Sequence, residues 1–230
     1  MLAPTKEAGV FIVAATGQKI RLTEWEEQDA WDCNALPATT DLLNLKISFF
    51  AGNQGNGGRK TDRDTNITKP NQLTSYNEMI VLRPWLMVEV AWGTATANLA
   101  DQQAIYGGGM LEVLKNNRPI ITNSHCYRFS SGYGLVGYGI DDAAGATSGI
   151  APGGSGVAGT AAQSPLLVPF QLVDNDQFGA ALTFPGSNAG ISGIAGGVSV
   201  DPPVWAAYGL SADVDVMVGL HGFMKRPATS

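Results

Sequence analysis

The segment from residue 78 to residue 92 constrains the fold most, because it is the most strongly strand-forming stretch of the chain. Its side chains alternate between an apolar parity and a mixed parity, which predicts a strand near the middle of a sheet. The apolar parity is Ile80, Leu82, Leu86, Val88, Val90 and Trp92, and the mixed parity is Met79, Arg83, Trp85, Met87 and Glu89. Pro84 has no amide proton, so we expect a bulge or bend there and the strongest pairing from Trp85 onward. We also expect a loop or a neighbouring subunit to cover the mixed face.

Other short runs with strand character recur along the chain, separated by turns rich in Gly and Pro. They span residues 10–14, 18–23, 44–50, 110–115, 118–122, 124–130, 135–140, 165–173, 178–184, 198–200 and 208–217. Asn116 and Asn117 predict a two-residue type I′ hairpin turn, and Pro119 predicts a return strand with an exposed side. No amphipathic helix is long enough for a parallel crossover. The pattern therefore predicts one all-β domain over residues 1–230, an antiparallel β-sandwich of the jelly-roll type.

One short helix is expected over residues 24–32. Thr23 and Glu26 have the spacing of a capping box, and acidic residues follow at a position that suits a helix N-terminus. Three long loops are expected at residues 51–77, 143–163 and 185–197. The first is polar and predicted to be exposed, and long loops of this kind often carry contact surfaces. The other two are rich in Gly and Ala, which suits loops packed against a neighbour.

The charge content limits the function. Only 15% of the residues are charged, against roughly 25% in an average soluble protein, and the net charge is −6. A surface with few charges does little to oppose association, which favours a chain that packs against other copies. An acidic chain without a basic cluster also argues against nucleic-acid binding. We expect no transmembrane segment and no signal peptide, and hence no secretion by that route.

Metal-binding patterns are weak. Asp62, Asp64 and Asn66 begin like a calcium loop, but Ile67 and Leu73 replace the glycine and the bidentate glutamate that such a loop needs. The sequence also lacks the paired Cys and His spacings of a zinc site. We therefore predict no bound metal, with the three oxygen ligands as the one weak calcium candidate.

Catalytic patterns are equally weak, and we expect no enzyme activity and no cofactor. The acid pairs Asp174 with Asp176 and Asp213 with Asp215 are predicted to be solvent-facing strand residues, although paired acids can serve glycoside hydrolysis. Cys33 and Cys126 are expected to be free, buried thiols, with a pairing between them left open. The five tryptophans, at positions 25, 31, 85, 92 and 205, are expected mainly in the core, with stacking on sugars as the alternative.

Four segments together resemble the β-barrel virion proteins of icosahedral bacteriophages, in particular single jelly-roll capsid proteins. They are the run Ile-Ser-Phe-Phe at 47–50, the loop around residues 61–67, the strand at 78–92 and the hairpin at 111–121. The resemblance implies a virion subunit that forms a shell with other copies and other virion proteins, assembled in the host cytoplasm.

The basic genome-binding arm of some capsid proteins is absent, so the resemblance implies no direct nucleic-acid contact and allows a position next to an internal viral membrane. Arg59, Lys60, Arg63 and Trp85 are the candidates for assembly contacts. The alternative function is a carbohydrate- or receptor-binding β-sandwich module, spike-like or lectin-like.

Overall fold

The structure is a computed structural model. It describes residues 2–4, 9–13, 17–21, 23–52, 60–73, 78–90, 95–129, 137–141, 148–153, 169–184, 193–195, 198–200, 209–210 and 213–225. Predictions for the rest of the chain, including Arg59, Trp92, Trp205 and most of the loops at 143–163 and 185–197, lie outside the described residues.

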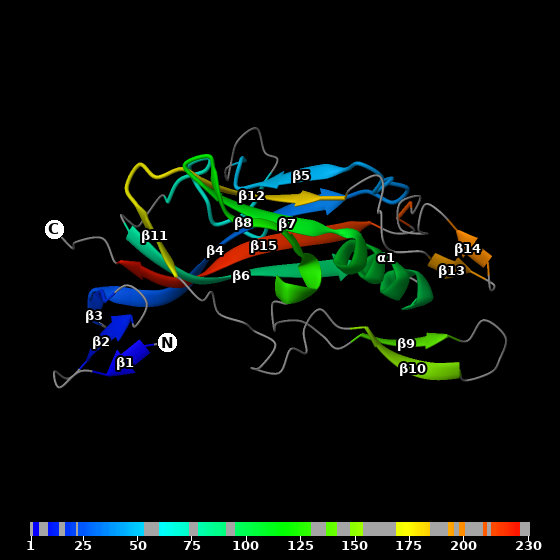
Figure 1. Ribbon diagram of the computed structural model, residues 1–230, viewed down its shortest axis with the longest axis horizontal. Coiled ribbons are helices and arrows are strands. Elements are labelled where there is room, and N and C mark those ends of the chain that lie inside the picture. The colour runs from blue at the N-terminus through cyan, green and yellow to red at the C-terminus, as the bar shows by residue number, and fades with distance from the viewer. Residues whose placement is uncertain are drawn as a thin grey trace.

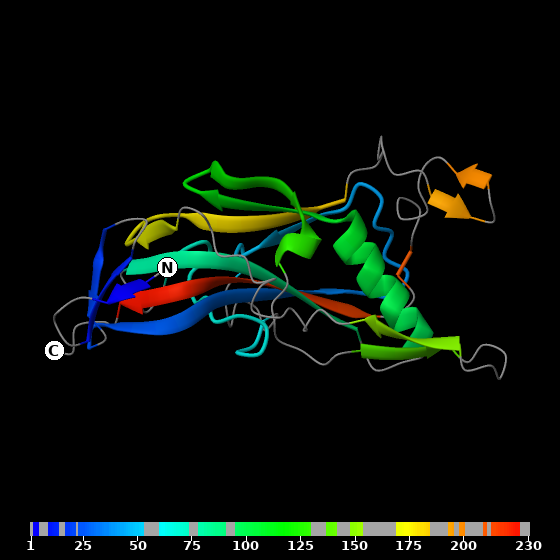
Figure 2. The ribbon, with the colours of Figure 1, turned by 60° about the horizontal axis from the view of Figure 1, so that its bottom comes forward.

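Two four-stranded antiparallel sheets form the body of the protein (Figures 1 and 2). The first sheet has the order β11 (Phe170–Val173), β6 (Glu78–Val90), β15 (Val214–Lys225), β4 (Trp25–Leu36). The second has the order β5 (Lys46–Phe49), β12 (Phe178–Thr183), β7 (Met110–Lys115), β8 (Arg118–His125). The predicted all-β antiparallel class is confirmed, and β6 is an inner strand as expected.

The main core lies between these sheets. Every second side chain along the strands of both sheets points into this core, because successive side chains of a strand point to opposite faces. From the first sheet come Ala30, Leu86, Val88, Val216 and Val218, and from the second come Ile47, Phe49, Leu111, Val113 and Leu182, all of them buried. Phe50 and Phe178 pack with their ring centroids 5.0 Å apart.

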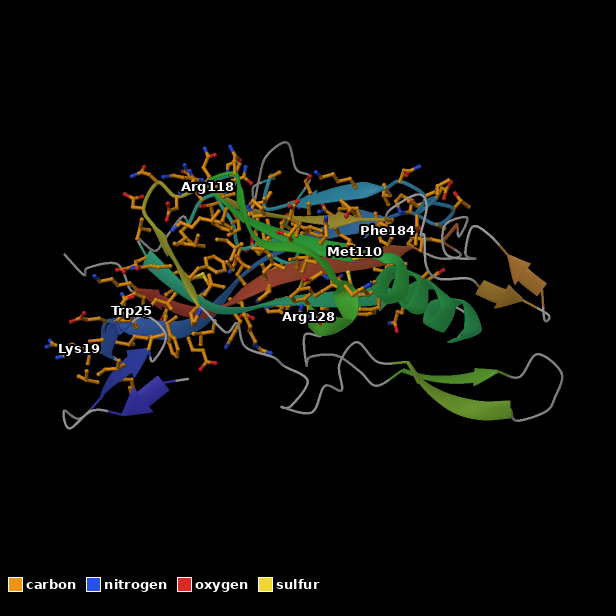
Figure 3. The ribbon with its side chains drawn as sticks, viewed as in Figure 1. Lys19, Trp25, Met110, Arg118, Arg128 and Phe184 are labelled. Carbon is orange, nitrogen blue, oxygen red and sulfur yellow. The ribbon has the colours of Figure 1, made fainter. Side chains whose placement is uncertain are left out.

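Smaller elements flank the sandwich. The strands β1 (Leu2–Pro4), β2 (Val10–Val13) and β3 (Lys19–Arg21) form a sheet at one end, where Trp25 lies close by in Figure 3. Val13 and Ile20 of this sheet join Trp25, Ile80 and Phe223 in a second apolar cluster. The helix α1 (Ala95–Gly108) lies at the other end of the sandwich (Figure 2). The remaining elements are η1 (Cys126–Phe129), β9 (Gly137–Asp141), β10 (Ser148–Gly153), β13 (Gly193–Ala195) and β14 (Val198–Val200).

The hairpin predicted around residue 116 is confirmed. Asn116 and Asn117 have φ values of 50° and 60°, as a type I′ turn requires, and Lys115 pairs with Arg118 across it. The return strand β8 is the edge of its sheet and is largely exposed, which accommodates Pro119.

The irregularity in β6 lies at Leu82, two residues before the predicted position. Arg83 pairs with His221 and Val81 pairs with Gly222, so Leu82 is an extra residue. The bulge exchanges the two faces of the strand: Met79 and Val81 join Leu86 and Val88 in the main core. The prediction of a single apolar parity is therefore wrong, and β6 pairs with β15 on both sides of Pro84.

The predicted helix at 24–32 is wrong, because β4 occupies that segment and pairs with β15 over twelve residues. A capping box contributes only about 1 kcal/mol, whereas the strand forms a continuous ladder and buries Trp25 and Ala30.

The helix occurs instead at α1, outside the one segment where a helix is expected. Ala104, Ile105 and Tyr106 of α1 are buried, and the Tyr106 hydroxyl donates to the Leu86 carbonyl at 3.1 Å. Among the described residues, no helix has the length and apolarity needed to cross a membrane.

The loop expected to be exposed at 51–77 is folded against β4 over its described part, residues 60–73. Thr65 and Ile67 are buried, and Thr65 forms an isolated bridge with Asp32. The expectation of an exposed loop holds for residues 61–63 and 68–70, but it is wrong for Thr65 and Ile67. The side chains of Thr65 and Asn66 bond to the β4 backbone, which holds this part of the segment against the sheet.

Candidate functional site

An open cleft of about 580 Å³ lies on the outer face of the first sheet, on the side opposite the main core. Strands β4, β6 and β15 and the 60–73 segment all contribute to it. Its lining residues are Glu27, Gln28, Asp29, Trp31, Asn66, Trp85, Met217 and His221.

Strand register brings these side chains together. Asp29 of β4 and Arg83 of β6 both lie opposite His221 of β15, and Trp31 and Trp85 both lie opposite Gly219. Directly paired residues point to the same face of a sheet. A Cβ atom on Gly219 would lie 2.1 Å from Cε2 of Trp85, so the indole lies across β15 at a position that only glycine allows.

A chain of hydrogen bonds crosses the three strands. Trp85 Nε1 donates to Asp29 Oδ2 at 3.0 Å, and His221 Nδ1 lies 2.6 Å from Asp29 Oδ1. His221 Nε2 lies 3.2 Å from Glu27 Oε1. Because an ionised carboxylate only accepts, Nδ1 of His221 is the donor toward Asp29. Trp85, Asp29 and His221 therefore hold one another in fixed orientations.

Asn66 attaches the 60–73 segment to the edge of the cleft. Its Oδ1 accepts from the Trp31 amide at 2.9 Å, and its Nδ2 donates to the Asp29 carbonyl at 2.7 Å. The side-chain amide thus satisfies two backbone groups of β4, which is the outer strand of its sheet. This contact sets the position of Trp31 relative to Asp29.

A buried ion pair lies on the inner side of the same strand. Asp32 is fully buried, its Oδ1 lies 2.7 Å from Lys60 Nζ, and its Oδ2 accepts from the Phe50 amide at 2.7 Å. Lys60 therefore serves this contact within the chain. Among the other assembly candidates, Arg63 is exposed and Trp85 is only 5% exposed. The expected cover of the mixed face of β6 is thus present at Trp85, where residues of the same chain provide it. Glu89, on the same strand, is exposed.

The calcium candidates Asp64 and Asn66 bond to different parts of the chain. Asp64 Oδ2 accepts hydrogen bonds from the backbone amide and the hydroxyl of Thr61, at 2.7 and 2.9 Å. The hydrogen bond from the backbone amide lowers the pKa of Asp64 below its ordinary value. Asn66 is bonded to β4, and Asp62 is exposed. The described residues contain no group of three or more His, Cys, Asp or Glu side chains that could hold a metal ion.

The prediction that both acid pairs are solvent-facing strand residues is wrong for three of the four acids. Asp174 and Asp176 lie in the connection between β11 and β12, and Asp213 precedes β15, although Asp174 and Asp213 are exposed. Asp176 lies in a turn, 2.9 Å from Lys115 Nζ, and Asp213 accepts from the Ala38 amide at 2.7 Å. Burial opposes ionisation of Asp176, but hydrogen bonds from Val173 and Asn116 and the charge of Lys115 leave its pKa below the ordinary value. Asp176 thus stabilises the turn after β11, and Asp213 joins the start of β15 to the segment after β4.

Cys33 and Cys126 are both free and buried, as expected. His125 is exposed, at the end of β8, whereas His221 lies in the cleft. Trp25 and Trp85 are buried, as predicted for core residues, and Trp31 is partly exposed.

Sequence reasoning missed most of the cleft. The alternation of Glu27, Asp29 and Trp31 was the available signal, but the acidic run suggested a helix instead. Their meeting with His221 and Trp85 depends on pairing across about 190 and 56 residues of chain. Comparison with protein families, with curated proteins and with solved structures found no match to this chain.

Proposed function

We propose that the sandwich is a jelly roll and that the chain is a virion structural protein, a non-enzymatic capsid-shell subunit of an icosahedral bacteriophage. It would assemble through lateral contacts with other copies of itself and with other virion proteins. It would not bind nucleic acid directly, and its location would be the virion.

The strand order carries this proposal. The strands of the two sheets occur along the chain as β4, β5, β6, β7, β8, β11, β12 and β15. The first pairs with the last, the second with the seventh, the third with the sixth and the fourth with the fifth: β4 with β15, β5 with β12, β6 with β11, β7 with β8. This is a long hairpin rolled up on itself, closed by the pairs β6 with β15 and β7 with β12. Jelly rolls with this architecture form viral shells and lectin domains.

The composition of the surface favours assembly with other subunits over a monomer. Charged residues make up only 15% of the chain, and Leu43, Ile120 and Val173 are large apolar side chains that are exposed. Ile120 lies on β8, which is an edge strand among the described residues, and an edge strand can offer its outer backbone groups for pairing with another chain. An edge of this kind suits lateral contact with another subunit.

Assembly can be tested on the full chain. Negative-stain electron microscopy and light scattering of the purified protein are expected to show closed or partly closed shells, or capsomer-sized oligomers, that form as concentration rises. A strict monomer by both methods, at all concentrations and ionic strengths tested, would contradict the proposal.

A second function, a carbohydrate- or receptor-binding module of the spike or lectin type, is favoured by one specific observation. The cleft places the partly exposed Trp31 beside carboxylate and amide side chains. An aromatic surface next to a few convergent polar groups is a common arrangement in ligand sites.

A further inference from the structure

We propose that the cleft of β4, β6 and β15 binds the pyranose ring of a neutral carbohydrate, with Trp31 as the stacking surface. This inference names a ligand for the second candidate function and rests on that candidate. It does not depend on shell assembly, which microscopy measures separately.

The aromatic part of the cleft consists of Trp31 and Trp85. Trp31 is partly exposed, and its backbone amide donates a hydrogen bond to Asn66, which fixes the backbone at this position. The Trp85 indole lies across Gly219 and donates to Asp29, so it has little freedom left to lose on binding. An indole offers a broad, stiff apolar surface, which suits the apolar face of a sugar ring.

The polar part of the cleft accepts hydrogen bonds. Asp29 and Glu27 supply carboxylate oxygens, each of which can accept more than one hydrogen bond. Gln28 also lines the cleft, but alternation along β4 places its side chain on the same side as Ala30, so it is not counted among these acceptors. The vicinal hydroxyl groups of a sugar are donors that carboxylate oxygens can accept.

The charges in the cleft select against anionic ligands. Among the described residues, the lining contains two acids and no Lys or Arg. Arg83 is paired with His221 but is not one of the lining residues. Sialic acids, uronic acids and phosphates would meet Glu27 and Asp29 with like charge. Asp29 already has hydrogen-bond partners within the chain in His221 and Trp85. The cleft volume of about 580 Å³ is within the usual range of small-molecule sites.

The experiment uses the full chain labelled with ¹⁵N and a panel of methyl pyranosides: glucoside, galactoside, mannoside and N-acetylglucosaminide. At least one is expected to shift the indole N–H signals of Trp31 and Trp85 while leaving that of Trp25 unchanged, since Trp25 lies in the second apolar cluster. The corresponding methyl glucuronide is expected to bind more weakly. Trp31→Ala is expected to weaken binding by at least about tenfold, and Trp31→Phe by less than about threefold.

Asp62→Asn is the matched control, because Asp62 is an exposed acid outside the cleft, and it is expected to leave binding unchanged. The wild-type indole shifts keep the test decisive if Trp31→Ala does not fold. Two results would overturn the proposal: no pyranoside in the panel shifts the Trp31 signal at millimolar concentration, or the glucuronide binds better than the neutral sugars.

Discussion

At the scale of single residues, Asp32 shows how one side chain joins separate parts of the chain. It belongs to β4, accepts a hydrogen bond from the backbone amide of Phe50 just after β5, and forms an ion pair with Lys60. Phe50 has a φ of 66°, an uncommon value for a bulky residue. The hydrogen bond from its backbone amide to Asp32 holds the chain in that conformation. The carboxylate is fully buried, so its charge depends on Lys60 for compensation.

Lys60→Met should therefore lower the free energy of unfolding by about 3 to 5 kcal/mol, because it leaves the Asp32 charge buried and unpaired. Urea denaturation measures the change. Lys19→Met, at an exposed lysine, is the control and should cost less than about 0.5 kcal/mol. In an Asp32→Asn background, Lys60→Met should cost much less than in the wild type. Equal costs in the two backgrounds would contradict this account of the pair.

The two thiols give a prediction about pH. Burial raises the pKa of Cys126 from 9.0 to about 12, and burial together with the charge of Asp215 raises that of Cys33 to about 12. Folded-state values above the unfolded value mean that unfolding releases protons at high pH. The contribution of the thiols to stability is complete below about pH 9 and is lost as the pH rises toward 12.

In the native protein at about pH 8, a thiol reagent should label neither cysteine, and both should react in guanidinium. The fall in unfolding free energy between about pH 8 and pH 10 should be smaller in Cys126→Ala than in the wild type. Fast labelling of the native protein, or identical pH slopes, would show that the thiols are more accessible than their burial indicates.

At the scale of elements, the bulge in β6 and the glycines of β15 decide which residues form the cleft. Gly222 lies opposite the bulge, where a Cβ atom would be 1.9 Å from the Ile80 carbonyl oxygen. Gly219 leaves the space that Trp85 occupies. The strands could pair without these features, but Trp85 would then not reach Asp29.

A double-mutant cycle tests the contact between Gly219 and Trp85. Gly219→Ala should lower the free energy of unfolding by about 2 to 3 kcal/mol, because its Cβ displaces the indole. In the Trp85→Ala background, where the space is open, the same change should cost less than about 1 kcal/mol. Urea denaturation of the four proteins gives the coupling. Additive costs would show that the indole does not rest on Gly219.

At the scale of the whole molecule, the strand pairs join segments that are far apart in sequence. β4 pairs with β15 across almost the full length of the chain. Such non-local pairing is slow to form, because the entropy cost of closing a long loop comes before the stabilising contacts between its ends. Each of the two sheets keeps two edge strands, and β8 is one of them. The proposed lateral contacts of a shell would use such an edge.

The sequence by itself determined the β class, the type I′ hairpin at Asn116 and Asn117, the inner position of β6 and the burial of both cysteines. These features depend on local periodicity and turn chemistry, which act over a few residues. Only the tertiary structure decided that residues 25–36 form a strand, that the helix lies at 95–108 and that β6 bulges at Leu82. Partner strands from distant parts of the chain override weak local preferences at these places. The cleft belongs to the second group, because Asp29, Trp85 and His221 meet only through the register of three strands.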